Sequence, residues 1–551
     1  MYRISALVVV FSCYLFNTSR AQQAAPVKVF THADTLRGSV TPERAWWDVI
    51  RYDISLVPDY EKKFISGANQ IGFKVLHPGC FMQIDLQEPM QIQSAIWREL
   101  PLKFKRTGNV FIVEFPEELL KGETETLTVQ FEGHPREAVK PPWDGGWIWT
   151  RDQLGRPWMT VTCQGIGASV WYPCKDYQGD EPDSGASLSV TVADTLVAVA
   201  NGRLREKKNN SDGTATYTWS VVNPINNYCL LPYIGKYVDI ADHFPGEKGL
   251  LDVDYWVLDY NQDKAKAHMQ PEVQRMLRCF EHWFGSYPFY EDGYKIVDAP
   301  YVGMENQSAI AYGNGYQNGY LKRDQSGTGW GNKWDFIIVH ESGHEWFANS
   351  ITAGDLADWW VHEGFTTYSE TLFTEYYFGR NAGNAYNHGL RKHILNDEPV
   401  IGPYGVNYDG TQDAYYKASS MIHIIRQIID DDSLFRQILR GLNHTFYHKT
   451  IETAQIEQYI SQHSNRDFSK VFDQYLRTTE VPVLEYKIEG SKLSYRWTNC
   501  VKGFDMPVKI HFGKGRWINP GEDWKSASWY TGKHPEFSVD PNFYINVKKT
   551  D

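Results

Sequence analysis

The spacing of hydrophobic residues changes twice along the chain. Over residues 46–242, apolar and polar positions alternate with a period of two, as at Tyr52, Ile54 and Leu56, and turn residues separate the runs. Alternation of this kind is typical of strands that bury one face. It predicts a sizeable β-domain in the first part of the chain.

A helical pattern replaces this alternation from about residue 250. Apolar residues then recur every three or four positions over the stretches 273–284, 334–350, 359–378, 416–430 and 451–475. After residue 477, short runs typical of strands return, with Gly, Pro and Asp between them. The pattern predicts a mostly helical domain followed by a small β-sandwich.

These changes divide the chain into three units of a multidomain α+β fold. We expect an N-terminal β-domain over residues 22–245, a mostly helical domain over residues 246–478 and a C-terminal β-sandwich over residues 479–551. A chain of 551 residues is too long for a single hydrophobic core, because domains hold on the order of 150 residues. Several cores and a large buried interior are therefore expected.

The first 21 residues have the pattern of an export signal. Arg3 supplies a positive charge, residues 4–16 are apolar, and Ser19-Arg20-Ala21 is a small-x-small cleavage site. The apolar run is shorter than the roughly 20 residues that cross a bilayer, which favours a cleaved signal peptide over a membrane anchor. We expect a secreted or periplasmic protein without an integral membrane segment after the signal is removed.

Composition and charge narrow the function classes. The chain has 42% hydrophobic and 22% charged residues, as globular proteins do. Its formal net charge of -12 argues against nucleic acid or an anionic membrane as a partner, because both repel an acidic protein. A cationic ligand group, such as the ammonium of a peptide, is compatible with this charge.

Two histidines in a predicted helix point to a metal site. His340 and His344 are four positions apart, so they share one helix face and suit two of the three protein ligands of a catalytic zinc. Glu341 lies beside the metal, where a general base belongs, and Glu363, on the next predicted helix, completes the ligand set. The alternative is surface histidines on an ordinary helix, but this string is rare by chance and rarer with Glu363 at its fixed spacing.

These residues resemble the aminopeptidase N and leukotriene hydrolase family of zinc metallopeptidases. In that family His-Glu-x-x-His is followed by a Glu ligand at this spacing, and Gly303-Met304-Glu305-Asn306 is similar to its Gly-x-Met-Glu-Asn exopeptidase strand. The resemblance covers about residues 46–477. It implies a thermolysin-like catalytic domain, one zinc ion per chain, and peptide substrates with a free N-terminus.

The resemblance also assigns residues that bind substrate. Glu305 would hold the terminal ammonium by a charge-assisted hydrogen bond, unless it serves a structural ion pair instead. Gly303 would let the substrate backbone approach, Met304 would line the first side-chain pocket, and Asn306 belongs to the same substrate-binding motif. Gln164 lies in a stretch similar to a β-domain segment of the family and would be a second anchor for the amine. An exposed loop glutamine is the alternative.

Tyr415 is the predicted donor to the tetrahedral intermediate, because its surroundings resemble the family's Tyr-Glu-Lys-Gly stretch. Tyr416, at the position of the family's Glu, and an ordinary core tyrosine are the alternatives. Two other positions depart from the family pattern. Ala348 stands where Gly is usual after the zinc helix, and His362, interpreted as a core histidine, replaces the Asn before the ligand Glu363.

We therefore expect a zinc-dependent aminopeptidase. Zinc would acidify a water molecule, Glu341 would take its proton, and Tyr415 would share the developing negative charge with the metal. Glu305 and Gln164 would set the register, so that the bond next to the free amine lies at the metal. The alternatives are a zinc endopeptidase, a catalytically inactive peptide-binding scaffold, and an epoxide hydrolase side activity. The preferred N-terminal residue, the limit on peptide length, the disulfide pairing and the oligomeric state stay open.

Overall fold

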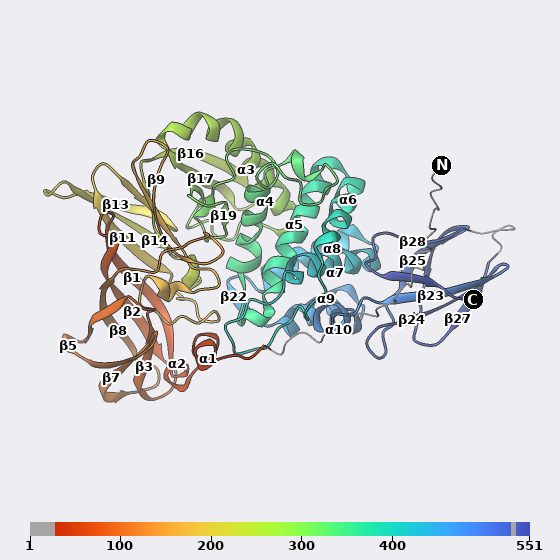
Figure 1. Cartoon of the computed structure of the whole chain (residues 1–551), viewed down its shortest axis with the longest axis horizontal. Helices are drawn as coiled ribbons and strands as arrows, with labels where there is room; N and C mark the ends of the chain where they lie inside the picture. Colours follow the sequence, from red (N-terminus) through yellow and green to blue (C-terminus); the bar gives the residue numbers. More distant parts are fainter. Residues whose placement is uncertain (1–27, 530–535) are drawn as a thin grey trace, which may run out of the picture.

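The computed structural model describes residues 28–529 and 536–551. A β-rich part lies at one end of the elongated molecule, C-terminal strands lie at the other, and helices fill the centre (Figure 1). The multidomain α+β fold predicted from the sequence is thus confirmed. The predicted export signal lies outside the described residues.

The N-terminal part is built on an eight-stranded sheet in the order β13-β14-β11-β1-β2-β8-β4-β5. Its strands are β1 (Trp47–Asp59), β2 (Phe64–Val75), β4 (Gln91–Trp97), β5 (Leu100–Pro101), β8 (Thr124–Gly133), β11 (Ala186–Ala193), β13 (Arg203–Asn209) and β14 (Thr214–Val221). In β1 the alternating residues Tyr52, Ile54 and Leu56 are buried, as the period of two predicts. One face of this sheet therefore covers a core.

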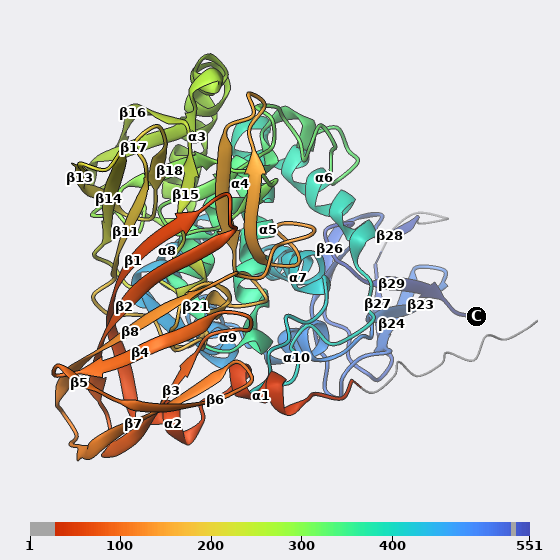
Figure 2. The ribbon, with the colours of Figure 1, turned by 60° about the vertical axis from the view of Figure 1, so that its left-hand side comes forward.

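Two smaller sheets complete this part. A three-stranded sheet contains β3 (Gly79–Asp85), β7 (Val110–Leu119) and β6 (Lys103–Thr107). A four-stranded sheet contains β12 (Val197–Val199), β15 (Tyr233–Gly235), β10 (Pro157–Thr162) and β9 (Gly146–Arg151). Two short helices, α1 (His32–Gly38) and α2 (Pro42–Ala45), precede β1. Figure 2 shows α1 where the β-rich part meets the helices.

The central part begins with a five-stranded sheet in the order β16-β17-β18-β20-β19. Its strands are β16 (Tyr237–Gly246), β17 (Gly249–Leu258), β18 (Tyr294–Asp298), β20 (Ile310–Tyr312) and β19 (Gly303–Met304). The predicted boundary after residue 245 therefore cuts through the β16–β17 hairpin. Strands lie on both sides of it, so the hydrophobic period does not change where one sheet gives way to the next.

Helices cover this sheet and form the centre of the molecule. They are α3 (Gln262–Phe284), α4 (Phe336–Gly343), α5 (Trp360–Phe378), α6 (Arg380–Leu390), α7 (Asp413–Ile429), α8 (Asp432–Thr445), α9 (Thr453–Ser464) and α10 (Ser469–Arg477). The helix predicted over residues 334–350 is shorter, because Phe347 and Ala348 leave the helical backbone in the π-helical segment η5 (Glu345–Asn349). The next strand along the chain, β21 (Ile351–Ala353), pairs in parallel with β22 (Lys449–Ile451).

The C-terminal part consists of two sheets, as predicted for a small β-sandwich. One contains β27 (Lys525–Ser528), β24 (Lys492–Thr498), β23 (Val483–Glu489) and β29 (Asn546–Lys549). The other contains β26 (Lys514–Ile518), β25 (Val508–Phe512) and β28 (Phe537–Val539). Trp497, from the first of these sheets, and Phe512, from the second, belong to the same core as the central helices. The sandwich is therefore packed onto the helical part.

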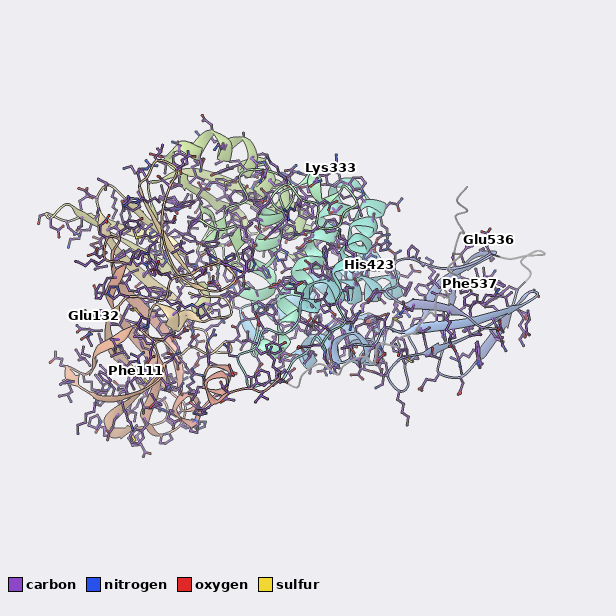
Figure 3. All side chains as sticks on the ribbon, in the orientation of Figure 1. Phe111, Glu132, Lys333, His423, Glu536 and Phe537 are labelled. Carbon is purple, nitrogen blue, oxygen red and sulfur yellow. The ribbon has the colours of Figure 1, made fainter. Side chains whose placement is uncertain are left out.

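Side-chain contacts join the three parts, and Figure 3 labels one of these side chains, His423, in the helical part near the C-terminal strands. His423, on α7, contacts Oδ1 of Asn542 in the C-terminal part at 2.9 Å. At the other junction, Met304 and Ala311 of the central sheet pack into the core of the N-terminal part. The edge strand β19 is thus held between two domains. Among the helices of residues 28–529 and 536–551, none combines the length and apolarity required to cross a membrane.

Candidate metal centre and active site

Two adjacent helices bring the predicted metal ligands together. Asp335 caps α4 by accepting hydrogen bonds from the two backbone N–H groups of residues 337 and 338. His340 lies on this helix, His344 is its C-cap residue one turn later, and Glu363 lies in the first turn of α5. Oε2 of Glu363 is 3.7 Å from Nε2 of His340 and 3.5 Å from Nε2 of His344. The three side chains are buried and can offer ligand atoms within 4.8 Å of one another.

The donor set fits zinc. Nδ1 of His340 is 2.6 Å from Oε1 of Glu370, and Nδ1 of His344 is 3.1 Å from the carbonyl oxygen of Phe347. Because these acceptors engage the Nδ1 protons, each Nε2 keeps a lone pair for a metal. Oε2 of Glu363 is buried without a hydrogen-bond partner, which is costly unless a cation occupies the space beside it. Two imidazoles and one carboxylate leave the fourth zinc position open.

Glu341 points into the same cleft from α4. Burial raises its pKa to about 7, an effect that the charge of His340 opposes and the carboxylates of Glu363 and Glu370 reinforce. Its carboxylate can also offer an oxygen within 4.8 Å of a ring nitrogen of the ligand His344, within reach of a water molecule at the metal site. The environment of Glu341 thus suits a group that takes a proton and returns it.

A cleft of about 470 Å³ contains this cluster. It is lined by the metal ligands and by most of the other residues singled out from the sequence, namely Gln164, Gly303, Met304, Glu305, Glu341 and Tyr415. Trp143 also lines the cleft, and its side chain is 72% exposed. The structure therefore assembles segments from the N-terminal and central parts around one space.

Glu305 and Gln164 meet within this cleft. Nε2 of Gln164 donates to Oε1 of Glu305 at 2.9 Å, and the hydroxyl of Tyr228 donates to the same oxygen at 3.2 Å. Burial raises the pKa of Glu305 to about 8, and the negative charges of Glu341 and Glu363 add to this effect. The charges that act on Glu305 are thus negative, so a structural ion pair does not explain this carboxylate. A substrate ammonium would be a favourable partner.

The two candidate tyrosines are distinguished by their surroundings. The ring of Tyr415 stacks on that of the metal ligand His340, with centroids 6.3 Å apart. Burial raises the pKa of Tyr415 well above the usual value, so the hydroxyl keeps its proton and can donate it to an oxyanion. Tyr416 packs instead against His393, with ring centroids 4.8 Å apart. The geometry therefore favours Tyr415 as the donor.

Two residues singled out from the sequence lie behind the cleft. The amide of Asn306 donates to the hydroxyl of Tyr233 at 2.8 Å, and Asn306 is not among the described residues that line the cleft. Asn306 thus packs against Tyr233 next to Glu305, and its contact with substrate stays a prediction. Nε2 of His362 accepts from the backbone N–H of Ala353 at 2.7 Å, and burial lowers its pKa to about 3. His362 is a neutral core histidine, as interpreted.

Sequence reasoning missed the residues behind His340. Oε1 of Glu370 faces Nδ1 of His340, and Oε2 of Glu370 accepts from the hydroxyl of Tyr386 at 2.6 Å. Glu370 lies seven positions after Glu363, or two helical turns, and so projects from the same face of α5. This spacing is the signal that identifies Glu370. No comparable signal exists for Tyr386, which comes from α6.

Comparisons with known proteins agree with this geometry. Residues 49–229 match the Peptidase M1 N-terminal domain, and residues 270–475 match the Peptidase family M1 domain. Aminopeptidase M1 of Arabidopsis thaliana is 23% identical over 502 residues, which cover 85% of this chain and 54% of that protein. Aminopeptidase B of Homo sapiens is 23% identical over 369 residues, which cover 63% of this chain and 52% of that protein. The chain spans about half the length of the curated relatives it matches.

A solved structure shares the fold. The M1 zinc metallopeptidase from Deinococcus radiodurans is similar with a TM-score of 0.65 and 21% identity, over 76% of this chain and 91% of that chain. A mutant of such an enzyme from the same organism, bound to a Tyr-Ser-Ala substrate, gives a TM-score of 0.67 with 20% identity and covers 80% of this chain and 97% of its own. The two matched domains together span more than half of the chain, and the second contains the ligand set His340, His344 and Glu363. The chain therefore belongs to peptidase family M1.

Proposed function

We propose that this protein is a zinc-dependent aminopeptidase that removes the N-terminal residue from peptides with a free amine. One observation carries the proposal. Glu305, Glu341 and His344 can offer atoms that all lie within 4.8 Å of one another. An ammonium bound at Glu305 is therefore about one residue away from the metal ligands, so the first peptide bond, and not a later one, reaches them.

The side chains have complementary roles in this reaction. His340, His344 and Glu363 would hold a zinc ion, which would supply a Lewis acid for the carbonyl and for water. Glu341 takes a proton from the attacking water and returns it to the leaving amine. The hydroxyl of Tyr415 donates to the developing oxyanion, a contact that contributes about 3 kcal/mol to transition-state stabilisation in comparable sites.

Glu305 and Gln164 orient the substrate before these steps. A carboxylate that accepts from an ammonium forms a charge-assisted hydrogen bond, which is stronger than a neutral one. In a zinc endopeptidase the same buried carboxylate would face a passing chain without a cation, at a cost in desolvation. The names of the curated relatives and the peptide bound to the solved relative support the exopeptidase reading.

A panel of aminoacyl-arylamides, each with its N-acetyl counterpart, tests the proposal when assayed with and without a zinc chelator. We expect release of the arylamine from the free-amine compounds, little from the acetylated ones, and loss of activity with chelator that added zinc restores. Equal cleavage of free and acetylated compounds would favour the endopeptidase. Absence of cleavage by zinc-loaded protein would favour the peptide-binding scaffold.

We also propose that the protein is exported and works outside the cytoplasm. The charge, apolar run and cleavage site of residues 1–21 support this proposal. Expression of the full chain in a bacterial host, followed by fractionation and N-terminal sequencing, tests it. Mature protein outside the cytoplasm that begins after Ala21 is the expected result, whereas cytoplasmic protein that retains these residues would contradict it.

A further inference from the structure

The segment of residues 28–45 precedes the region that matches the M1 N-terminal domain, yet its Arg37 contacts Gly165, a residue that lines the cleft. Its helix α1 begins with a capping box, in which Asp34 accepts from the backbone N–H of Thr31 at 2.7 Å. Figure 2 shows α1 at the junction of the β-rich part and the helices. This position allows one side chain of α1 to contact both.

Arg37, in the last turn of α1, holds the turn that follows Gln164. Its Nη1 donates to the carbonyl oxygen of Gly165, and its Nε donates to Oδ2 of Asp176 at 3.3 Å. The Asp176 carboxylate also accepts from the backbone N–H of Ser169 at 3.2 Å. The guanidinium of Arg37 thus connects the two ends of the stretch 165–176.

Gly167 makes room for this arrangement. Its φ of +94° lies in the region that favours glycine, and a Cβ atom added there would be 2.4 Å from Nε of Arg37. The side chain of Arg37 is 23% exposed and that of Asp176 is 8% exposed. Water therefore competes weakly with the Arg37–Asp176 pair, which can fix the guanidinium, whereas the hydrogen bond to Gly165 lies at the surface.

The same carbonyl is held from the helical part. Nδ2 of Asn407 donates to the oxygen of Gly165 at 3.4 Å, and the backbone N–H of Asn407 donates to the carbonyl oxygen of Asp34 at 3.0 Å. Asn407 precedes the loop whose residues 409–412 line the cleft. The helix α1, the turn after Gln164 and this loop are therefore tied together.

The helix α1 is itself firmly anchored. Arg44 is fully buried, and its guanidinium donates to the carbonyl oxygens of Leu36 and Ser39 and to the carboxylate of Asp85. The α1 backbone also lies close to the chain that leads into the loop 409–412, since a Cβ atom added at Gly38 would be 2.1 Å from the backbone of Val406. The position of Arg37 is thus set by a rigid support.

We propose that Arg37 is a positioning residue for recognition of the substrate amine, acting through the Gly165 carbonyl to hold Gln164 against Glu305. The inference rests on the proposed aminopeptidase function and extends the amine site to a segment outside the two matched domains. Without Arg37 the Gln164 side chain loses its support, and Glu305 loses one of its two side-chain donors. The hydrogen bonds and ion pairs of His340, His344 and Glu363 do not involve α1, so we expect Arg37 to leave metal binding unaffected.

The variants Arg37→Gln, Gln164→Ala and the double variant test this inference with a free-amine arylamide. Arg37→Gln is expected to raise KM about tenfold with a less than twofold change in kcat, and to leave zinc content unchanged. In the Gln164→Ala background, Arg37→Gln is expected to have no further effect on KM, because residues that act through one another are not additive. Arg37→Lys, which keeps the charge but not the fork of donors, should give a smaller rise.

Arg51→Gln is the matched control. Arg51 also donates to one backbone carbonyl, that of Ser184 at 2.8 Å, and to one aspartate, Asp53 at 3.0 Å, but it lies outside the cleft lining. The variant Arg51→Gln should therefore have the same KM as the wild type. An unchanged KM in Arg37→Gln, or KM effects of Arg37→Gln and Gln164→Ala that multiply in the double variant, would overturn the inference while the proposed function stands.

Two further outcomes are decisive. A zinc-loaded wild-type protein that fails to cleave free-amine arylamides would overturn the proposed function, and the inference with it. If Arg37→Gln does not fold, Arg37→Lys carries the comparison. A KM that Arg37→Lys raises in the wild-type background but not in the Gln164→Ala background supports the inference, and a KM equal to that of the wild type overturns it.

Discussion

The two sides of the cleft are assembled in different ways. The metal side, formed by His340, His344 and Glu363, comes from one stretch of 340–363 on two adjacent helices. The amine side, formed by Gln164 and Glu305, joins positions 141 residues apart that belong to two domains. The geometry of the metal side therefore depends on local helix structure, whereas that of the proposed amine side depends on how the domains meet.

The supports of the two sides differ in the same way. Behind the metal side, Glu370 and Tyr386 hold His340 from within the helical core. Behind the amine side, Arg37 reaches Gly165 across 128 residues from a segment at the start of the described chain. Substitutions on the metal side should therefore alter catalysis or zinc affinity, and those on the amine side should alter selectivity for the free amine.

Glu341→Gln should have the largest effect, because it removes the proton-transfer group of the metal side and leaves the ligands in place. We expect kcat to fall about 10³-fold, within the range of general acid–base catalysis, with unchanged zinc content. Steady-state kinetics and metal analysis measure both quantities. Glu206→Gln, a change of an exposed glutamate on β13, serves as the control. A near-normal kcat would contradict the role of Glu341 as the base.

Glu305→Gln should act on selectivity. Loss of a hydrogen bond to a charged group costs about 2 kcal/mol, which corresponds to about 30-fold in kcat/KM for the free-amine arylamide. The N-acetyl compound lacks the ammonium, so its slow hydrolysis should not decrease. The ratio of kcat/KM for the free-amine compound to kcat/KM for the N-acetyl compound should therefore fall. A ratio equal to that of the wild type would show that the ammonium is bound elsewhere.

Glu370→Gln should weaken zinc binding about tenfold. Partners that orient a metal ligand contribute about 10- to 100-fold in affinity, and the low end applies because the glutamine carbonyl still accepts from Nδ1 of His340. Competition with a fluorescent zinc chelator measures the change. Tyr386→Phe, which removes only the hydrogen bond to Glu370, should have a smaller effect. Unchanged affinity in both variants would show that His340 needs no support.

The same contrast explains what the sequence could predict. The spacing of hydrophobic residues predicted the strands and most helices, and the spacing of His and Glu residues predicted the metal side. Both depend on residues close together in the sequence. The amine side requires knowledge of how the domains pack, and no short pattern links Arg37 to Gly165. Helix α6 escaped prediction because its sequence is rich in Gly and Asn, which are weak helix formers. The choice between Tyr415 and Tyr416 required the rotation of α7 about its axis.

The turn after the zinc helix connects the two sides and carries backbone strain. Ala348 has a φ of +150°, where an L-residue is disfavoured by about 1–2 kcal/mol. On one side of this residue, the carbonyl of Phe347 faces Nδ1 of His344. On the other, Nδ2 of Asn349 donates to the carbonyl oxygen of Glu305 at 2.9 Å. The turn thus keeps the metal ligand and the amine anchor in register.

Ala348→Gly should give the smallest effect, a gain in stability. Relief of strain exceeds the roughly 0.5–1 kcal/mol that glycine loses to chain entropy, so we expect a net gain of about 0.5–1 kcal/mol and a rise in Tm of about 1 °C or less, because the shift per kcal/mol falls with chain length. Ala357→Gly is the matched control, because Ala357 is outside the positive-φ set and should lower Tm. Since glycine adopts the same turn, activity should stay within twofold. A stabilised variant with reduced activity would mean that the strain itself keeps His344 and Glu305 in register.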